Sequence, residues 1–491
     1  MSNIGQSLQQ VREFRVQKLN KLKELGFDPY PARVQKDKNN AELINNFDEL
    51  QGKDFFITGR IVSIRSYGKL LFLDVQDESG KIQCIGMPQN VIGLETKYLE
   101  FGQLDLIDNG DFVEVFGTLG KSKTGEISIL VKSIRIITKS LRPIPDELND
   151  VEERQRKRYL DINVNGSKDK LDLQARFERR SKFWQANRDF LNSKGFIEMN
   201  MPVLELTTGG ADANPFVTHM DAIDQDFYLR ISHELPLKRL IGAGYEKVYD
   251  IGPRFRNEGF SDEHLPEHIA MEWYWAYADF QKGMEFMEEM FKFISYEVWG
   301  TTKFENMKGF EEIDLEKKWE VITYEQILQD RFGIDIWNVD LDKVNVELAK
   351  FDDKAENINR GIDKLWKKIR ATIGGPVWMI YEPAFLSPLA KPSDTDKRIT
   401  ERFHPIIAGS ELGNGFSELN DPQLQLQNFL EQEKLREEGD AEAQMLDDDF
   451  VEMLEYGMPP TCGWGHAERN FWFFENVSAR EGVIFPPMRR K

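Results

Sequence analysis

The sequence is 491 residues long, too long for one ordinary hydrophobic core, so we expect two to four domains. Its composition, with 40% hydrophobic, 30% charged and 12% aromatic residues, is typical of globular proteins and argues against disorder. A formal net charge of −20 argues against nonspecific nucleic-acid binding, and no run approaches the ~20 apolar residues of a membrane span. Without a secretory segment, and with only two distant cysteines, a cytoplasmic protein lacking a disulfide or zinc framework is expected.

Residues 1–50 are expected to form a helical, partly basic extension. The first 36 residues carry seven Lys or Arg against three Asp or Glu. Between residues 8 and 25 apolar side chains recur near helical spacing, with basic residues among them: Val11, Phe14, Leu19, Leu22 and Leu25. This pattern predicts an amphipathic helix that either packs on its own protein or lies along a nucleic-acid backbone.

Residues 51–140 have the pattern of a small β-barrel. Five short runs between residues 54 and 138 suit strands, and a helical stretch near 91–103 precedes the fourth. This arrangement is typical of an OB-type Greek-key barrel, a fold that often binds oligonucleotides by aromatic stacking and polar edges. Phe72, Gln83 and Glu126 are candidates for such a face, although Phe72 in this pattern is more often a core residue.

The rest of the chain has mixed helical and strand character. Residues 141–170 contain prolines and a charge run, so we expect a linker leading to an extended arm. A second, larger domain is expected over 171–491, with a long helix that ends at Gly195 and a helical insert over about 305–375. The run FIEMNMPVL suits a strand, in which Pro202 restricts the position to a sheet edge or an interface.

The segment RFRNEGFSDEHLPEH, residues 254–268, concentrates the chemistry. Period-two alternation on both sides predicts two antiparallel strands joined by a long loop. Arg254, Arg256 and Glu258 then share one face, and Glu272 and Tyr274 point away from an apolar row formed by Ile269, Met271, Trp273 and Trp275. Guanidinium groups fork onto phosphate or carboxylate oxygens, and carboxylates bind ammonium groups. This surface therefore suits a ligand that carries both signs of charge.

A metal is the competing interpretation of the same segment. His264 and His268 are four residues apart, as in helical zinc sites. However, Pro266 disfavours a helical turn between them, and Leu265 stands where a metalloprotease would carry glutamate. A phosphate-bearing ligand is favoured over zinc.

The same residues resemble motif 2 of the class II aminoacyl-tRNA synthetases, most closely the lysyl enzymes. The segments FRNEG and MEWYWAYADF carry this resemblance and place motif 2 at about 247–280. GFIEMNMPVL resembles motif 1 at about 195–204, and EYGMPPTCGWGHAER and REGVIFPPMRR resemble the motif 3 region at about 457–480. Further segments resemble lysyl-specific blocks or the anticodon-binding domain: TTGGADANPFVTH, LRISHELPLKRL, ELGNGFSELND and GKLLFLDVQDESGKIQ.

The resemblance implies an α+β architecture, in which an N-terminal OB-type anticodon-binding barrel precedes a catalytic domain built on an antiparallel sheet flanked by helices. It also implies a reaction. The carboxylate of L-lysine attacks the α-phosphate of ATP, giving lysyl-adenylate and pyrophosphate, and the lysyl group then moves to tRNA(Lys). Arginines and Mg²⁺ suit this chemistry, because phosphoryl-type displacement depends on positioning and charge neutralisation. Mg²⁺ is the implied cofactor, a homodimer with Pro202 at its interface is expected, and no membrane partner is implied.

Site residues follow from the same resemblance. Arg256 would bridge the α-phosphate and the lysine carboxylate, and Arg469 would meet the γ-phosphate, so these two form the catalytic pair. The lysine site would consist of Gly210, Glu234, Arg256, Glu272, Tyr274, Asn414, Phe416 and Glu418, with Glu234, Tyr274 and Glu418 around the ε-ammonium group. The ATP site would consist of Arg256, Glu258, His264, His268, Glu411 and Arg469. Anticodon contacts would fall on Arg65, Phe72, Gln83 and Glu126.

Three departures from the family pattern concern the nucleotide half of the site. His268 stands where the family stacks a phenylalanine on adenine. His404 stands at a usual carboxylate position, which leaves Glu411 as the expected Mg²⁺ ligand, since imidazole binds Mg²⁺ poorly. The segment GWGHAER is one residue shorter than the usual motif 3 run.

These departures leave a second hypothesis open. The chain would then be a catalytically impaired paralogue that binds lysine or tRNA as a regulator. A relative that lysylates a protein is disfavoured by the OB domain, and aspartyl or asparaginyl specificity is disfavoured by Glu234, Tyr274 and Glu418, which suit a cation.

Overall fold

The computed structural model describes residues 7–91, 96–166, 170–259, 261–438 and 443–490. The chain divides into two compact units. The first comprises residues 1–149 and 159–164, and the second comprises residues 150–158 and 165–491. Among the described helices none is long and apolar enough to cross a membrane.

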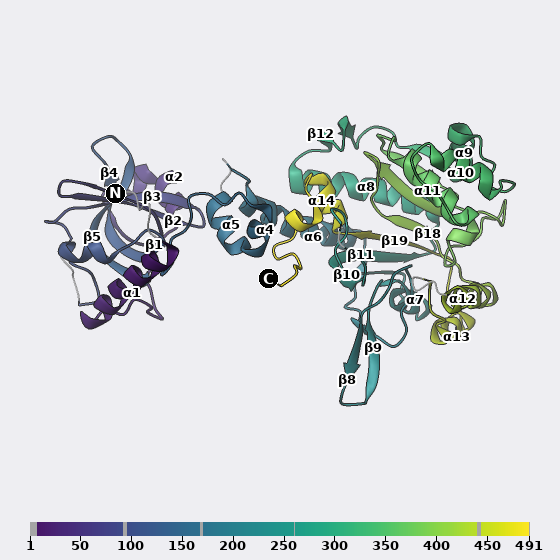
Figure 1. Ribbon diagram of the computed structural model, residues 1–491, viewed down its shortest axis with the longest axis horizontal. Helices are drawn as coiled ribbons and strands as arrows, with labels where there is room; N and C mark the ends of the chain where they lie inside the picture. The colour runs from purple at the N-terminus through teal and green to yellow at the C-terminus, as the bar shows by residue number, and fades with distance from the viewer. Residues whose placement is uncertain (1–6, 92–95, 167–169, 260, 439–442, 491) are drawn as a thin grey trace. The chain divides into compact units, whose positions relative to one another are not determined.

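The first unit is an OB-type barrel, as the strand pattern predicted (Figure 1). Its strands close in the order β1-β2-β3-β5-β4, and only the β3–β5 pair is parallel. Alternate residues such as Ile57, Val75 and Val115 point inward and are fully buried, which is the period expected of a barrel. The strands are β1 (Asp54–Tyr67), β2 (Leu70–Asp77), β3 (Gly80–Gly86), β4 (Phe112–Lys121) and β5 (Ile127–Thr138), with the 3-10 helix η1 (Phe101–Leu106) before β4.

The amino-terminal helix packs on this barrel. Helix α1 (Leu8–Glu24) buries Leu19 and Leu22, and α2 (Asn40–Asn45) and α3 (Phe47–Leu50) follow it. The guanidinium of Arg15 donates to the Asn109 carbonyl at 2.9 Å, and Lys18 pairs with Asp108 at 2.8 Å. Two basic side chains of α1 are thus used inside the unit, which supports packing on the protein's own surface rather than along a nucleic acid.

The segment expected to be an extended arm is helical instead. Helices α4 (Val151–Arg156) and α5 (Arg158–Asn165) occupy it. The side chain of Asp150 caps α4 by accepting from the Glu153 amide at 2.8 Å, and Arg156 pairs with Glu152 one turn earlier. The charge run therefore stabilises short helices, because its opposite charges lie four residues apart.

The second unit is built on a mostly antiparallel sheet with the strand order β14-β15-β16-β18-β19-β11-β10-β6, and β17 pairs with β16 (Figure 1). The β10–β6 and β14–β15 pairs are parallel. Smaller sheets have the orders β7-β9-β8 and β12-β13. The strands are β6 (Ile197–Glu198), β7 (Leu204–Glu205), β8 (Val217–Met220), β9 (Gln225–Leu229), β10 (Lys247–Phe255), β11 (Glu267–Ala276), β12 (Lys303–Met307), β13 (Phe310–Asp314), β14 (Glu320–Thr323), β15 (Val377–Ile380), β16 (Arg402–Ile407), β17 (Ser410–Glu411), β18 (Asn414–Ser417) and β19 (Thr461–Ala467).

Helices cover this sheet and seal its core. The long helices α6 and α8 pack against an aromatic cluster that includes Phe183, Trp273 and Phe471. On the other side, α7, α12 and α13 share a smaller cluster around Phe429 and Phe450. The helices are α6 (Leu173–Ser193), α7 (Glu234–Gly242), α8 (Phe280–Trp299), α9 (Tyr324–Phe332), α10 (Leu341–Ala349), α11 (Ile358–Arg370), η2 (Ala384–Leu386), α12 (Pro422–Glu437), α13 (Asp448–Tyr456), α14 (Arg469–Phe474) and α15 (Ala479–Gly482).

Three expected elements differ in detail from the observed ones. The run FIEMNMPVL forms no continuous strand, because pairing stops after β6 and resumes only at β7, with Pro202 in the break. The insert over 305–375 begins with strands and becomes helical only at α9. Strand β10 ends at Phe255, so Arg256 and Glu258 lie in the following loop rather than on the strand.

Candidate functional site

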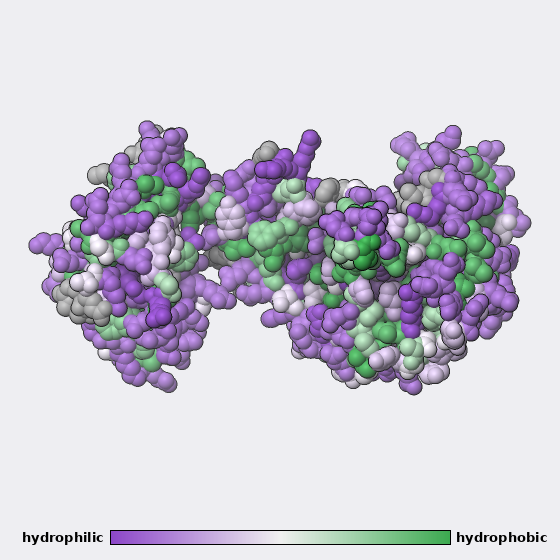
Figure 2. Space-filling model, turned by 90° about the horizontal axis from the view of Figure 1, so that it is seen from below, coloured by the Kyte–Doolittle hydropathy of each residue, from purple (hydrophilic) through white to green (hydrophobic). Residues whose placement is uncertain are grey.

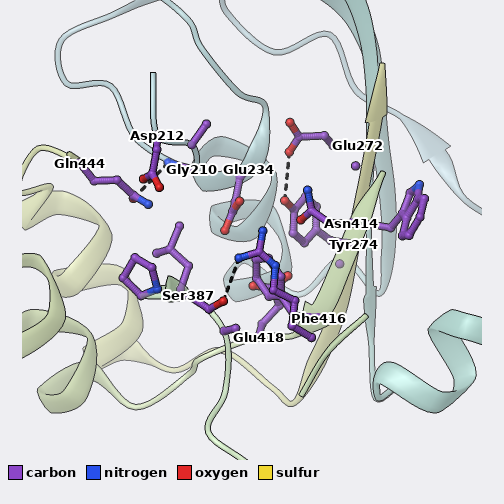
Figure 3. Close-up of a pocket in the computed structure, with 18 of the residues that line it drawn as sticks. Gly210, Asp212, Glu234, Glu272, Tyr274, Ser387, Asn414, Phe416, Glu418 and Gln444 are labelled. Atoms are coloured by element: carbon purple, nitrogen blue, oxygen red, sulfur yellow. Dashed lines mark hydrogen bonds between the residues drawn. The ribbon is translucent and has the colours of Figure 1, made fainter. Parts of the chain in front are cut away.

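A cavity of about 280 Å³ lies against the polar side of β11, between α7 and strands β18 and β19 (Figure 3). Strand β11 turns Met271 and Trp273 into the aromatic core, so Glu272 and Tyr274 face the cavity as their alternation predicted. The cavity is lined by every residue that the sequence assigned to lysine: Gly210, Glu234, Arg256, Glu272, Tyr274, Asn414, Phe416 and Glu418.

Glu272 is fixed by its hydrogen bonds. Its Oε1 accepts from Ser232 Oγ at 2.8 Å and from the His233 amide at 3.1 Å. Its Oε2 accepts from the Tyr274 hydroxyl at 3.1 Å. Burial, together with nearby carboxylates, raises the pKa of Tyr274 well above its ordinary value, so the hydroxyl keeps the proton that it donates. The carboxylate is therefore held in one orientation at the cavity wall.

Gly210 brings backbone to the opposite wall. Its φ is +83°, and a Cβ added there would lie 2.7 Å from the Glu234 Cβ. Its amide donates to Gln444 Oε1 at 3.4 Å. Only glycine combines this backbone conformation with such a close approach, which leaves an amide and a carbonyl beside the carboxylates.

Glu234 and Glu418 lie deep in the cavity and share a buried cation. Lys238, one turn along α7, pairs with Glu234 Oε1 at 2.5 Å and also pairs with Glu418 Oε2. All three side chains are almost inaccessible. Burial raises the pKa of both carboxyl groups, while Lys238 opposes that rise. Lys238 was not among the site residues that the sequence indicated.

A second cavity, of about 150 Å³, adjoins the first. It is lined by every residue that the sequence assigned to ATP: Arg256, Glu258, His264, His268, Glu411 and Arg469. Arg254 and Arg256 line both cavities, so the two guanidinium groups form a shared wall. Burial, reinforced by Arg256, lowers the pKa of Arg254 to about 9. Glu272 Oε1, 3.4 Å from a terminal nitrogen of Arg254, balances part of this positive charge.

His268 is a neutral imidazole in this wall. Its Nε2 accepts from Arg254 Nε at 2.9 Å, and its Nδ1 lies 3.0 Å from the Leu265 carbonyl, to which it donates. Burial and the arginines lower the pKa of His268 well below its ordinary value. The ring thus orients Arg254, and it carries no charge of its own.

Arg469 opens helix α14 directly after β19, at the end of the shortened motif 3 run. It lines the second cavity and pairs with Glu263 of the loop after β10, and Glu263 also pairs with Lys308. His264, in the same loop, lies with its Nδ1 2.8 Å from Ser261 Oγ. The shortening of motif 3 therefore leaves its arginine at the cavity, although an internal carboxylate holds it.

The residues around Glu411 do not fit the expected Mg²⁺ site. Glu411 Oε1 pairs with His404 Nδ1 at 2.9 Å, and Oε2 pairs with Arg370 at 3.1 Å. Glu382 lies on the other side of His404, at 3.6 Å from Nε2. Among the residues that the structure describes, no group of three His, Cys, Asp or Glu side chains is placed to hold a metal ion. His404 and Arg370 thus occupy both oxygens of the carboxylate that the sequence assigned to Mg²⁺.

The expected anticodon residues lie on neighbouring strands of the barrel. Arg65 on β1 is directly opposite Phe72 on β2, and Asp74 on β2 is opposite Gln83 on β3. Arg65 pairs with Asp74 at 2.8 Å, and Gln83 donates to Glu126 Oε2 at 2.8 Å. Phe72 is half-buried rather than a core residue. These side chains therefore lie on neighbouring strands in two separate hydrogen-bonded pairs, and Gln83 is only 7% exposed.

Sequence reasoning missed several residues of these surfaces. Tyr67, which is 68% exposed, lies beside Phe72 with ring centroids 6.1 Å apart, and its position two residues after Arg65 on a strand was the available signal. Arg254 shared the strand face of Arg256 but was not assigned a role. Lys238 had no signal, because a Glu and a Lys four residues apart usually mark an exposed helix face.

Comparisons with known proteins agree with this geometry. Residues 150–489 match the family of class II tRNA synthetases (D, K and N), and residues 55–137 match the OB-fold nucleic acid binding domain. Curated relatives named lysine–tRNA ligase include one from Thermosipho africanus, 41% identical over 98% of this chain and 96% of the relative. Others come from Thermotoga maritima, 40% identical over 99% of this chain and 97% of the relative, and Staphylococcus epidermidis, 38% identical over 99% and 100%. The chain therefore belongs to the lysine–tRNA ligase family of class II tRNA synthetases.

Proposed function

We propose that the two adjoining cavities bind the two substrates of lysine activation, lysine in the first and ATP in the second. The protein is a lysyl-tRNA synthetase, and full-length relatives give no support to the impaired paralogue. The observation that carries the assignment is the shared wall of Arg254 and Arg256. A lysine carboxylate and an α-phosphate are both anions, and they must meet where cations can neutralise both.

The reaction joins these anions at one phosphorus. A carboxylate oxygen of lysine attacks the α-phosphorus of ATP, the bond from that phosphorus to the bridging oxygen breaks, and pyrophosphate leaves with the bonding electrons. Arg256 faces both cavities and is proposed to hold the two reacting groups together, while Arg469 takes the distal phosphates after releasing Glu263. A hydroxyl of the tRNA's terminal ribose then attacks the lysyl carbonyl and loses its proton, and AMP leaves.

Selectivity for lysine follows from the carboxylates of the first cavity. We propose that Glu234 and Glu418 receive the ε-ammonium group, with Tyr274 and Phe416 beside its methylene chain. Glu272, already oriented by Ser232, and the Gly210 backbone are proposed to meet the α-amino group. A neutral side chain of similar length would leave buried carboxylates without a new cation and would bind poorly.

Mg²⁺ is proposed to enter with ATP, as the counter-ion of its phosphates, rather than bound in advance by a cluster of protein carboxylates. This follows from the pairing of Glu411 with His404 and Arg370. Mg²⁺ prefers hard oxygen ligands, which the triphosphate supplies in abundance.

The barrel surface around Phe72 is proposed to read the anticodon of tRNA(Lys). Arg65, Gln83 and Glu126 offer donors and acceptors at base edges, and Phe72 offers a ring on which a base can stack. Their internal hydrogen bonds hold these groups in place. The protein is proposed to act in the cytoplasm, where charged tRNA is used.

We also propose that two copies of the chain associate through the motif 1 region. Pro202 is exposed, and apolar side chains around it are too, with Ile197 at 51% and Leu206 at 59%. Hydrophilic residues cover most of the face drawn in Figure 2, with hydrophobic areas among them. Exposed apolar side chains that gather around one segment are typical of an interface.

The experiment that tests the assignment is amino-acid-dependent exchange between pyrophosphate and ATP, with each of the twenty amino acids and no tRNA. Exchange with lysine alone is expected. Exchange with another amino acid would contradict the proposed pocket. Circular dichroism shows whether the protein is folded. If folded protein gave no exchange with any amino acid, the proposed catalytic activity would be rejected and the hypothesis of a catalytically impaired paralogue would be supported.

A further inference from the structure

The first cavity holds its carboxylates in place with a lysine of the protein itself. Lys238 is fully buried and is not one of the residues that line the cavity. Its ammonium group reaches Glu234 Oε1 at 2.5 Å and also contacts Glu418 Oε2, so it bridges the two carboxylates from behind. Figure 3 shows the Glu234 side chain, from α7, among the residues that line the cavity.

In each carboxylate, one oxygen contacts the Lys238 ammonium group and the other oxygen does not. Glu418 Oε1 is buried and accepts no hydrogen bond from the residues that the structure describes. It is also tightly seated, because a Cβ added at Gly463 would lie 2.2 Å from this oxygen and 2.4 Å from Tyr274 Cε1. A buried carboxylate oxygen without a donor is costly, and it points to a cation donor that the protein does not supply.

The surroundings of Lys238 stabilise its charged ammonium group in a fixed position. Aromatic rings lie around its ammonium group, with centroids at 5.3 Å for Phe416 and 5.9 Å for both Tyr274 and Phe450. Burial alone would lower the pKa of Lys238, but Glu234 and Glu418 raise it. The lysine is therefore charged, and its charge has no path to solvent.

The net charge of Glu234, Glu418 and Lys238 suggests what this arrangement does. Two carboxylates and one ammonium carry a net charge of −1, which one further ammonium group neutralises. Without Lys238, two buried carboxylates would stand alone, and such pairs retain a proton between them. A substrate ammonium would then have to displace that proton before both carboxylates could bind it.

We propose that Lys238 is a specificity-determining residue, an internal counter-ion that orients Glu234 and Glu418 as a pair and sets the charge of the pocket so that it takes one further ammonium group. This inference rests on the proposed function of the cavity as the lysine site. Lys238 acts through the two carboxylates and does not touch the substrate, so it is a positioning residue.

The test is Lys238→Met, which keeps the length of the side chain and removes its charge, in the full-length protein. In lysine-dependent exchange between pyrophosphate and ATP, KM for lysine is expected to rise about 10²-fold while KM for ATP changes little. KM for lysine is also expected to fall as pH rises, because the shared proton must leave. Other charged or titratable groups around this centre are common to both proteins; they include Glu272 and Tyr274 from β11, Arg402 from β16, Arg254 from β10, Arg256 from the loop after it and Cys462 from β19.

The barrel offers a matched control. Lys139 is also fully buried and also lies between two carboxylates, at 2.6 Å from Asp108 and 2.8 Å from Asp111. Lys139→Met is expected to lower the melting temperature without raising KM for lysine. A rise in KM for lysine in both variants would mean that any buried lysine has this effect, and it would overturn the inference.

A second variant covers the case in which Lys238→Met does not fold. Lys238→Met combined with Glu418→Gln removes one charge of each sign and keeps the net charge at −1, so it is expected to be more stable than Lys238→Met alone. Equal or lower stability of the double variant would overturn the inference, as would an unchanged, pH-independent KM for lysine in Lys238→Met. Failure of the wild-type protein to use lysine would instead contradict the proposed function.

Discussion

The cavities proposed for lysine and for ATP, called here the lysine cavity and the nucleotide cavity, share a wall but hold their charged residues in different ways. In the lysine cavity the acidic groups are fixed by partners that can remain when a ligand binds: Ser232 for Glu272, and Lys238 for Glu234 and Glu418. In the nucleotide cavity the charged groups hold one another, Arg469 with Glu263 and Glu411 with Arg370. These pairs must open if a triphosphate is to use the same arginines. The lysine cavity is pre-organised, whereas the nucleotide cavity is closed by internal ion pairs.

This contrast has an energetic reason. Selectivity for one amino acid needs rigid acceptors, because a carboxylate that can turn away accepts many side chains. A triphosphate carries enough charge to displace surface and half-buried ion pairs, each of which contributes little on its own. The more rigidly held charged groups are therefore those of the cavity proposed to discriminate between amino acids.

The largest effect is expected at the wall that the two cavities share. Arg256→Ala removes the side chain proposed to hold both reacting anions, so lysine-dependent exchange is expected to fall about 10³-fold or more. Arg398→Ala, at an exposed ion pair with Asp396, is the control and should keep wild-type exchange. Near-normal exchange by folded Arg256→Ala would falsify the assignment of the shared wall.

The next largest effect is expected in the lysine cavity alone, so it distinguishes the two cavities. Glu418→Gln keeps the shape of the lysine cavity and removes one of its buried charges, so KM for lysine is expected to rise about 10²-fold while KM for ATP stays within about threefold. Steady-state exchange with each substrate varied in turn measures both constants. If both rose equally, Glu418 would not belong to an ammonium pocket, and the contrast between the cavities would fail.

A smaller effect is expected from changing the nucleotide cavity at its departure from the family pattern. His404→Glu replaces the imidazole beside Glu411 by a second carboxylate, which creates a pair of oxygen ligands. We expect this variant to bind Mn²⁺ about 10-fold or more tightly than the wild type in the absence of ATP, measured by electron paramagnetic resonance.

His404→Gln is the control for that gain, since it removes the imidazole without adding a carboxylate. Equal Mn²⁺ affinity of the wild type and His404→Glu at this site would show that the pairing of Glu411 with His404 and Arg370 does not exclude a metal.

Sequence reasoning located both cavities but not what holds their residues. Glu272 and Tyr274 were predictable because strand alternation places them opposite Trp273, and the five-stranded barrel was predictable from its short runs and turns. The remaining roles came from resemblance. Lys238 was not predictable, because its position four residues after Glu234 also fits a solvated ion pair, and only packing against Phe450 and Phe416 makes it internal.

Two further features were missed for different reasons, one long-range and one local. Arg370 reaches Glu411 from the end of the insert, 41 residues earlier in the chain, which no local pattern encodes. The helices α4 and α5 arose where prolines suggested an extended arm, because Asp150 caps α4 and the charges that follow it pair along the helix. The helical signals lie within that segment, whereas the prolines that suggested an extended arm lie upstream of it.

The smallest effect concerns a buried imidazole next to the nucleotide cavity. His466 on β19 is 3% exposed and stacks on Trp184, and its Nδ1 accepts from Trp464 Nε1 at 3.0 Å. Burial, with Arg254 nearby, lowers the pKa of His466 from 6.5 to about 3. The neutral ring therefore contributes stability that is fully present above pH 6.5 and is lost as pH falls from 6.5 towards 3, by roughly 1.4 kcal/mol per pH unit.

The variant His466→Asn offers an acceptor to Trp464 but cannot take up a proton in this range. We expect it to be less stable than the wild type at pH 7, because the ring packing is lost, but to lose less stability between pH 6 and pH 4, as measured by urea unfolding. His219→Asn is the control, since that side chain is 45% exposed and should leave the slope unchanged. If the stability of His466→Asn fell with pH as steeply as that of the wild type, other groups would be responsible for the loss of stability in acid. Burial of a neutral His466 ring beside the shared wall would then not explain that loss.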